Sequence, residues 1–230
     1  MNICVFKRYE LKYLLDEEQY ENVLRAAEGY LKADKYGQST IQSLYYDTDN
    51  FRLARRSLER PPYKEKLRLR SYGLAKDGDT LFLELKRKSD GVVYKRRIEI
   101  SDEAARSRDF GDSQIGKEIA YFFGFYNDLS PKILLLYDRT AYFGKGDLRV
   151  TFDKNIRYRT DRLSLSSGLD GKPIRTDGKI LMEIKTGTAI PLWLAHILSG
   201  EHIAKTSFSK YGEAYQIEQP LKAKEVNNIE

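Results

Sequence analysis

Apolar and polar positions alternate along much of this chain with the period of two that is typical of β-strands. Short segments rich in Gly and Asp, such as Asp77-Gly78-Asp79 and Ser89-Asp90-Gly91, separate several alternating stretches and are typical of hairpin turns. Strands joined by hairpins pair antiparallel. The alternation predicts strands near residues 4–13, 40–47, 63–72, 80–88, 92–100, 132–143, 147–153 and 179–186.

Helical periodicity interrupts these strands in four places. We predict helices from Asp16 to about Lys35 and over 114–126, 190–199 and 208–217. The helices over 114–126 and 190–199 are amphipathic and need an apolar sheet face to cover. The sequence therefore predicts one α+β domain over residues 1–230. Its eight-stranded antiparallel sheet is expected to close into a tunnel-like barrel, with the helices packed outside.

Within each predicted strand, the parity of the positions separates charged from apolar side chains. Glu183 and Lys185, for example, alternate with Met182 and Ile184, and six strands repeat such a pattern. If helices cover the apolar faces from outside, the charged faces line the barrel. A charged interior is costly to desolvate unless an anion fills it, and its carboxylates are suitable ligands for a divalent metal. The alternative is a half-buried sheet whose charged face meets solvent.

Composition supports a folded protein that meets an anionic partner. The chain is 41% hydrophobic and 12% aromatic, which excludes a disordered tail protein. Its 40 Lys and Arg exceed its 34 Asp and Glu, leaving a net charge of +6. Fourteen of the 40 basic side chains fall within residues 52–70 and 84–100, so the positive charge is concentrated in two short stretches of the chain.

Several classes of site and location are excluded by what the chain lacks. Cys4 is the single cysteine, which excludes an internal disulfide framework and a multi-cysteine metal site. With His196 and His202 as the two histidines, a histidine-rich zinc site is also excluded. The N-terminal residues are too polar for a signal peptide, and no apolar stretch approaches the ~20 residues of a membrane span. We expect a soluble cytoplasmic protein without a membrane segment.

Eight segments in sequence resemble the VTC domain, the polyphosphate polymerase domain of the vacuolar transporter chaperone complex. That domain belongs to the CYTH, or triphosphate tunnel metalloenzyme, superfamily. Single motifs such as ExK are weak, but eight in order over nearly the whole chain are specific. The segments are YELKYLL (9–15), SLYYDTDN (43–50), KLRLRSYG (66–73), FLELKRK (82–88), YDRTAYFG (137–144), LRVTFDKNI (148–156), ILMEIKTG (180–187) and SFSKYGEAY (207–215).

The resemblance implies an eight-stranded antiparallel tunnel that binds the triphosphate of ATP and a growing polyphosphate chain. It implies an ATP–polyphosphate phosphotransferase, with no nucleic-acid partner. Glu183 of MEIK would hold the divalent metal, Mn²⁺ or Mg²⁺, and Tyr137 and Ser209 lie in matching motifs. Carried over motif by motif, the phosphate ligands would be Lys12, Arg68, Arg70, Lys86, Arg139, Arg149, Lys185 and Lys210.

The first strand departs from one pattern of the superfamily. Its hydrolases and cyclases often begin with ExExK, whereas this chain has Arg8-x-Glu10-x-Lys12. The missing first glutamate removes one possible metal ligand and favours the polymerase branch.

Two other functions remain open at this stage. The first is a tripolyphosphate or nucleoside triphosphate hydrolase of the same tunnel fold, which would need the same phosphate ligands. The second is a non-catalytic module that binds polyanions or nucleic acid. Tyrosines interleaved with the basic strands would provide stacking surfaces for it, although such tyrosines equally fit ordinary packing in a sheet. The tyrosines are Tyr45, Tyr46, Tyr63 and Tyr72.

Overall fold

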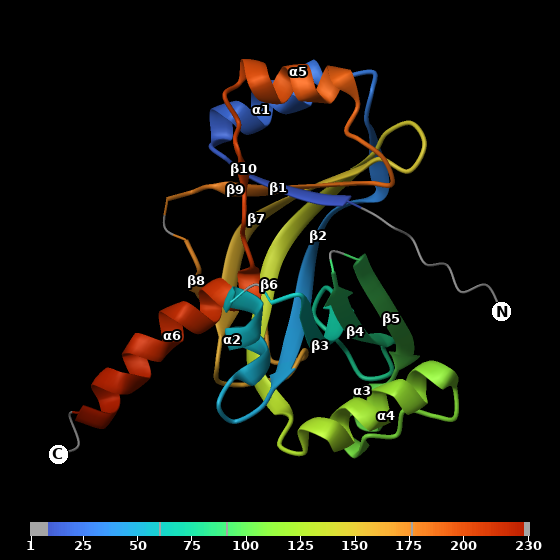
Figure 1. Ribbon diagram of the computed structural model, residues 1–230, viewed down its shortest axis with the longest axis vertical. Helices are drawn as coiled ribbons and strands as arrows, with labels where there is room; N and C mark the ends of the chain where they lie inside the picture. The colour runs from blue at the N-terminus through green and yellow to red at the C-terminus, as the bar shows by residue number, and fades with distance from the viewer. Residues whose placement is uncertain (1–8, 60, 91, 176, 228–230) are drawn as a thin grey trace. The chain divides into compact units, whose positions relative to one another are not determined.

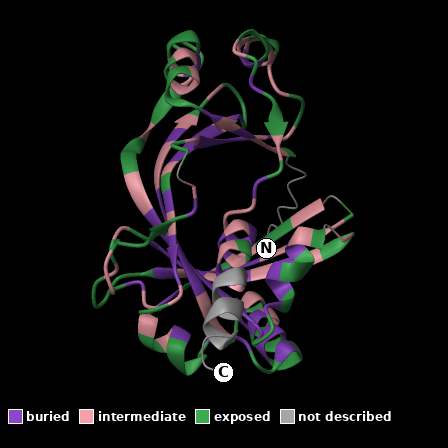
Figure 2. Cartoon of the chain, turned by 90° about the vertical axis from the view of Figure 1, so that its left-hand side faces the viewer, coloured by how far each residue is buried: buried purple, intermediate pink, exposed green. Residues whose placement is uncertain are grey.

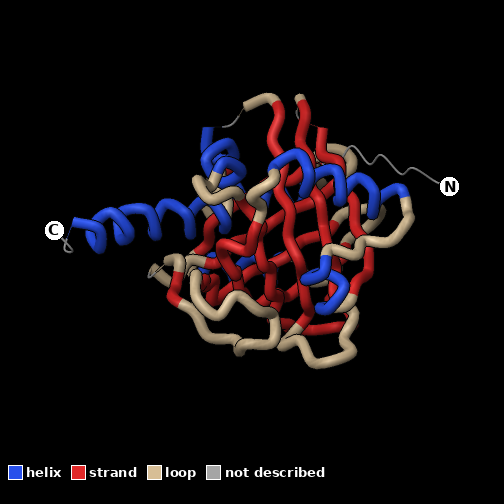
Figure 3. The backbone as a smooth tube through the Cα atoms, turned by 90° about the horizontal axis from the view of Figure 1, so that it is seen from below, coloured by secondary structure: helices blue, strands red, loops and turns tan. Residues whose placement is uncertain are grey.

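The structure, a computed structural model, describes residues 9–227 apart from 60, 91 and 176. Six helices lie in this part of the chain (Figure 1): α1 (Glu17–Ala26), α2 (Arg52–Glu59), α3 (Asp102–Ser107), α4 (Gln114–Tyr126), α5 (Leu192–Gly200) and α6 (Lys210–Asn227). The strands, drawn in red in Figure 3, are β1 (Tyr9–Leu15), β2 (Lys32–Asp47), β3 (Tyr63–Tyr72), β4 (Leu81–Ser89), β5 (Val92–Ile100), β6 (Ser130–Phe143), β7 (Arg149–Arg159), β8 (Lys172–Pro173), β9 (Ile180–Thr186) and β10 (Lys205–Thr206). No helix in the described part of the chain is long and apolar enough to cross a membrane.

The strands form a ten-stranded sheet in the order β10-β1-β9-β7-β6-β2-β3-β4-β5, with β8 beside β7. The pairings of β1 with β9, β2 with β3, β3 with β4, β4 with β5 and β7 with β9 are antiparallel, which confirms the predicted α+β class.

The predicted closure of the sheet is not confirmed. Among the described residues, the order ends at β10 and β5, and no hydrogen-bonded pairing joins these two strands. β10 contains only two residues, and β5 carries Lys95, Arg96 and Arg97 in succession. Charged side chains on an edge strand are one of the features that prevent further strand pairing.

The chain divides into two compact units. The first unit comprises Met1–Thr40, Tyr137–Ile156 and Arg175–Phe208. The second comprises Ile41–Leu136, Arg157–Ile174 and Ser209–Glu230. The long strands β2, β6 and β7 contribute residues to both units.

In the first unit, α1 and α5 cover the apolar faces of β1, β7 and β9 (Figure 1). The apolar cluster beneath the two helices includes Leu15, Val23, Phe152, Met182 and Leu194, all at most 1% exposed. Asp16 begins α1 with a capping box, because its carboxylate accepts from the backbone N–H of Gln19 and the Gln19 side chain accepts from the N–H of Asp16.

The predicted helix from Asp16 to about Lys35 is too long. In the structure α1 ends at Ala26, and β2 begins at Lys32. Gly29 lies between them with a φ of +83°, a conformation that glycine adopts at little cost and that a helix cannot continue through.

In the second unit, α3 and α4 cover the apolar faces of β3, β4 and β5. Leu67, Leu69 and Leu83 are at most 2% exposed there and pack in one cluster with Phe122 of α4. Figure 2 shows the middle parts of the sheet as buried, whereas the start of β2, most of β5 and the outer sides of the helices are intermediate or exposed. The predicted separation of apolar and charged strand faces is therefore confirmed within each unit.

Several element boundaries agree with the predictions, and several elements were missed. The predictions for 63–72, 92–100 and 114–126 match β3, β5 and α4. The helices α2 and α3 and the two-residue strands β8 and β10 were not predicted. Arg8, Cys4 and the start of the predicted strand 4–13 lie outside the described residues.

Candidate functional site

Three lysines lie directly opposite one another across the polar face of the second unit. In the strand register Lys66 of β3 faces Lys86 of β4, and Lys86 faces Lys95 of β5. Directly opposed residues in an antiparallel pair have Cβ atoms about 5 Å apart, and like charges in that position destabilise the sheet. A bound anion would remove this repulsion.

The next row on this face centres on Glu84, which is 1% exposed. One carboxylate oxygen of Glu84 lies 2.7 Å from the Nη2 of Arg68 and 3.7 Å from the Nη1 of Arg70. The other lies 2.6 Å from the Nζ of Lys95. Burial would raise the pKa of Glu84, but these three cations outweigh it and hold that pKa well below its usual value. Glu84 is thus a fixed anion that holds three cations in place.

Glu84, Arg68 and Arg70 also affect the pKa of Lys95. Partial burial lowers the pKa of Lys95 to about 8; Glu84 acts in the opposite direction, while Arg68 and Arg70 add to the lowering. Since a phosphate next to this ammonium group would favour its charged form, bound anion would raise that pKa again.

Uncharged hydroxyl groups complete the polar face of the second unit. The guanidinium of Arg68 donates to the Tyr45 hydroxyl at 2.9 Å, and the Nε of Arg70 donates to the Ser43 hydroxyl at 3.2 Å. The Ser209 hydroxyl accepts from the Nζ of Lys66 at 3.0 Å and lies just before α6, whose first residue is Lys210. Of the predicted ligands in this unit, Arg68 and Arg70 share Glu84, and Lys86 lies in the lysine row.

In the first unit, three predicted cations surround the predicted metal ligand. The carboxylate of Glu183, with a side chain 7% exposed, lies 3.5 Å from the Nζ of Lys12 and 3.6 Å from the Nζ of Lys185. The Nη2 of Arg139 lies 3.5 Å from the same carboxylate. Lys12 also contacts Glu10 at 3.4 Å and donates to the backbone carbonyl of Phe208 at 2.9 Å. The pairing of β1 with β9, which sets Lys12 opposite Glu183, produces this cluster.

Arg139 is fixed by a second carboxylate. Its Nε and Nη2 donate to the two oxygens of Asp153 at 2.6 and 2.7 Å, a bidentate pair in which Asp153 is fully buried. The ring of Tyr137 lies 5.1 Å from the guanidinium carbon. Burial would lower the pKa of Arg139, but Tyr137, Asp153 and Glu183 outweigh it and raise that pKa above its usual value. Arg139 is therefore a permanent cation beside Glu183.

Arg149 has a different environment from the other predicted ligands of the first unit. It lies opposite Lys185 in the strand register. Its guanidinium, however, lies 5.1 Å from the centre of the Phe143 ring and 3.9 Å from the carboxylate of Asp34. The side chain is 42% exposed, so it is available to a ligand from solvent.

The carboxylates of the first unit permit one mode of metal binding. Among the described residues, no group of three or more His, Cys, Asp or Glu side chains is arranged to hold a metal ion. Mg²⁺ is often bound through one or two carboxylates, with the substrate's phosphates completing its ligands. Glu183 would suit that mode only with phosphate present, because Lys12, Arg139 and Lys185 beside it attract phosphate but repel a metal ion that arrives alone.

Charged residues of these clusters that were not predicted as site residues include Lys66, Glu84, Lys95 and Asp153. Strand parity had placed each of them on a charged face. What the sequence lacked was the cross-strand register, which aligns Lys66 and Lys95 with Lys86 and places Asp153 within reach of Arg139.

Replacing Asp153 with asparagine is expected to lower the free energy of unfolding by about 3 kcal/mol, because it leaves the Arg139 guanidinium buried with less neutralisation. Urea denaturation would measure the loss. The matched control is Glu17→Gln, which removes an exposed carboxylate 2.7 Å from Lys154 in the same unit and should cost less than about 1 kcal/mol. Equal effects of the two substitutions would contradict a structural role for the Arg139–Asp153 pair.

Comparisons with known proteins agree with this architecture. The family model described as the VTC domain matches residues 7–218, and so spans both units. None of the curated proteins compared with the chain matches its sequence significantly.

Three solved structures share the fold. A Hippeastrum protein, described as a putative adenylyl cyclase with a dominant triphosphatase activity, has a TM-score of 0.52 and 17% identity, covering 88% of this chain and 92% of its own. A Pyrococcus horikoshii protein has a TM-score of 0.51 and 14% identity, covering 93% and 99%. A putative adenylate cyclase from Vibrio parahaemolyticus has a TM-score of 0.50 and 11% identity, covering 90% and 97%. Because the family model matches most of this chain, residues 7–218, the chain belongs to the VTC domain family.

Proposed function

We propose that this chain is a polyphosphate polymerase that transfers the γ-phosphoryl group of ATP to the end of a polyphosphate chain and releases ADP. One observation carries the proposal: the opposed lysines Lys66, Lys86 and Lys95 lie beside Arg68 and Arg70 on one face, with Glu84 as their central carboxylate. A face built in this way favours a ligand with several negative charges. Membership of the VTC domain family supports polyphosphate as that ligand.

The reaction joins two polyanions. A terminal oxygen of the polyphosphate forms a bond to the γ-phosphorus of ATP, and the bond from that phosphorus to the β–γ bridging oxygen breaks. The leaving group is ADP, and the chain is one phosphate longer. Phosphoryl transfer requires little covalent chemistry from a protein, so alignment and charge neutralisation are its main contributions.

Repulsion between the two substrates sets the number of cations required. One pair of unit charges 4 Å apart costs about 4 kcal/mol at an effective dielectric constant of about 20. Arg68 and Arg70 would bind phosphate oxygens through two N–H groups each, whereas Lys86 and Lys185 act as point charges. Glu84 and Glu183 each hold three cations before the substrate arrives, which reduces the ordering that binding must impose. The remaining proposed ligands are Lys12, Tyr137, Arg139, Arg149, Ser209 and Lys210.

Glu183 is the proposed ligand of a divalent metal, Mn²⁺ or Mg²⁺. Such an ion, when bound, neutralises negative charge on phosphate oxygens. Lys12, Arg139 and Lys185 contact the Glu183 carboxylate and orient it, so this chain's own contribution is a positioned ligand in a positive environment.

Triphosphate hydrolysis is the second candidate, and the Hippeastrum neighbour described by a dominant triphosphatase activity favours it. The same cations would then bind the triphosphate, and water would attack the terminal phosphorus.

Nucleic-acid binding through tyrosine stacking has less support from the structure. Tyr45 stacks on Tyr211 with ring centres 4.4 Å apart, and Tyr46 packs edge-on against Phe123. Both tyrosines are less than 9% exposed, so their rings serve packing within the second unit. Tyr63 and Tyr72 are 43% and 55% exposed; the Tyr63 hydroxyl is bound to Glu65, and Tyr72 packs edge-on against Phe82, so these two leave stacking open.

A product assay separates the two enzyme activities. Purified protein would be incubated with ATP labelled at the γ-phosphate, a short polyphosphate primer and Mn²⁺ or Mg²⁺. We expect ADP in equal amount to label that enters long polymer. If the label appears as orthophosphate with or without primer, the chain is a hydrolase. If ATP is bound but not consumed under any of these conditions, the chain is a binding module.

A further inference from the structure

A cavity of about 340 Å³ lies within the second unit, lined by residues of α2, β3, β4 and α4. This volume is in the range of sites for small organic ligands. Glu65 of β3 lines it and alternates with Lys66, whose side chain belongs to the polar face described above. Lys64, which also lines the cavity, shares the parity of Lys66, so the cavity borders the polar face at the start of β3, whereas Glu65 and its cross-strand partner Arg87 belong to the opposite face.

Glu65 is the fixed anion of this cavity and is only 8% exposed. The hydroxyls of Tyr63 and Tyr126 each donate to its carboxylate at 2.6 Å, and the Nε of Arg87 donates at 3.3 Å. Burial and the Glu65 carboxylate raise the pKa of Tyr63 to about 12 and also raise the pKa of Tyr126. Both hydroxyls therefore remain hydrogen-bond donors. The negative charge of Glu65 is balanced by the guanidinium of Arg87.

The cations of the cavity are in excess. Arg52 and Arg56 line it from α2, four residues apart, and neither forms an ion pair with any described residue. Like charges at that helical spacing repel each other. Lys64 and Arg87 also line the cavity, and Arg87 contacts Glu118 at 3.7 Å. Arg87 is shared between Glu65 and Glu118, and Glu118 also contacts Arg96 at 3.4 Å. Arg52 and Arg56, the two arginines of the cavity without an ion pair among the described residues, leave two positive charges for a ligand.

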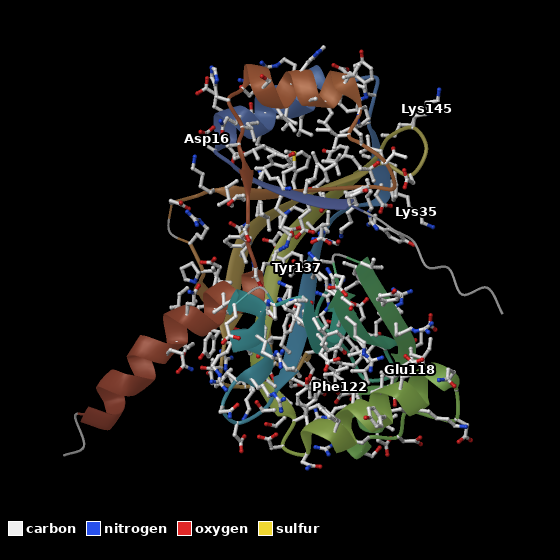
Figure 4. All side chains as sticks on the ribbon, in the orientation of Figure 1. Asp16, Lys35, Glu118, Phe122, Tyr137 and Lys145 are labelled. Atoms are coloured by element: carbon white, nitrogen blue, oxygen red, sulfur yellow. The ribbon has the colours of Figure 1, made fainter. Side chains whose placement is uncertain are left out.

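Aromatic rings form the remaining wall (Figure 4, in which Glu118 and Phe122 of α4 are labelled). Phe122 is 2% exposed and closes the inner side. Tyr121 and Phe125 are 69% and 56% exposed, and their rings stack with centres 6.2 Å apart. The guanidinium of Arg52 lies over the Tyr126 ring at 5.4 Å. Large exposed rings at the rim of a cationic cavity are suited to a planar group that carries an anion.

We propose that this cavity binds a phosphate monoester carried by a planar ring system, the chemistry of a nucleoside monophosphate. A phosphate monoester carries a charge of about −1.5 to −2 at pH 7, which matches the excess of two cations. Arg52 and Arg56 present guanidinium groups that suit phosphate oxygens, and Tyr121 and Phe125 present faces for the ring.

The test is equilibrium binding of AMP to the full chain by isothermal titration calorimetry, without ATP or polyphosphate. Arg56→Ala is expected to weaken AMP binding about tenfold, the usual scale for losing a charge-assisted contact to phosphate. The matched control is Arg55→Ala, which removes the same charge from an exposed neighbour on α2 that does not line the cavity and should leave the affinity unchanged. Tyr121→Ala, at an exposed position, should weaken AMP binding about fivefold or more through loss of stacking.

Inorganic phosphate and adenosine test the two halves of the ligand separately, and both should bind more weakly than AMP. Phosphate that binds as tightly as AMP, together with no effect of Tyr121→Ala, would overturn the role of the ring. Loss of AMP binding in Lys86→Ala but not in Arg56→Ala would place the nucleotide on the polar face and reject this cavity. Absence of AMP binding at millimolar concentration would reject the proposal outright.

Discussion

Glu183→Gln is expected to abolish metal-dependent turnover while keeping, or tightening, the binding of triphosphate without metal. The amide keeps the size of the side chain but is a poor ligand for Mg²⁺ or Mn²⁺. Losing the metal's stabilisation of the transition state is worth several kcal/mol, which is about a thousandfold or more in rate. The substitution also removes a negative charge that lies within 3.6 Å of Lys12, Arg139 and Lys185, so these cations become freer to attract phosphate.

Titrations of activity and of triphosphate affinity, each with and without Mn²⁺, would measure both effects. Glu10→Gln is the matched control, because it makes the same change beside Lys12 on β1. If the Glu183 variant keeps a normal metal requirement and is only less stable, Glu183 is an ion-pair partner and not a metal ligand. Loss of the metal requirement in Glu10→Gln or Glu84→Gln instead would move the ligand to that residue.

Lys86→Ala is expected to reduce turnover by about 100-fold to 1,000-fold, the usual effect of removing one preorganised electrostatic group. Its effect on stability should be small or favourable. Lys86 lies between Lys66 and Lys95 in the register, so its removal relieves two like-charge contacts when no anion is bound. We expect an unchanged or slightly higher melting temperature.

Lys117→Ala provides the matched control, because Lys117 is an exposed lysine on α4 in the same unit. Both turnover and melting temperature should be unaffected there. A Lys86 variant that melts well below the wild type would show that Lys86 has a mainly structural role. A Lys86 variant with full activity would remove the residue from the proposed site.

The polar and apolar faces of the strands could be predicted from the sequence because a side chain's face depends only on its parity within the strand. Leu67 and Leu69 are buried against α4, as the alternation predicts, whereas Arg68 and Arg70 contact Glu84 on the other face. The resemblance carried by eight motifs was equally accessible, because each motif is a short run of residues. It agrees with the match of the VTC domain model.

The start of α2 was not predicted, because the side chains that cap it lie several residues before the helix at the end of β2 and are held by a distant residue. The helix Arg52–Glu59 contains three arginines, and the residue directly before it is Phe51, whose side chain cannot cap a helix. In the structure, the carboxylate of Asp47 at the end of β2 accepts from the backbone N–H groups of Leu53 and Ala54, both at 2.9 Å. Tyr211 of α6 donates to the same carboxylate at 2.7 Å. The contacts of Asp47 with Leu53 and Ala54 are local in the chain, whereas the contact with Tyr211, 164 residues away, has no local signal.

The sequence by itself determined the α+β class, the face on which each charged side chain lies and the family to which the chain belongs, since these depend on local alternation and on short motifs. Only the tertiary structure decided which charges meet. Pairing of β3, β4 and β5 aligns Lys66, Lys86 and Lys95, and pairing of β1 with β9 sets Lys12 opposite Glu183. Strand register is set by hydrogen bonds and packing between segments distant in sequence, and a shift of one residue would move every side chain to the other face.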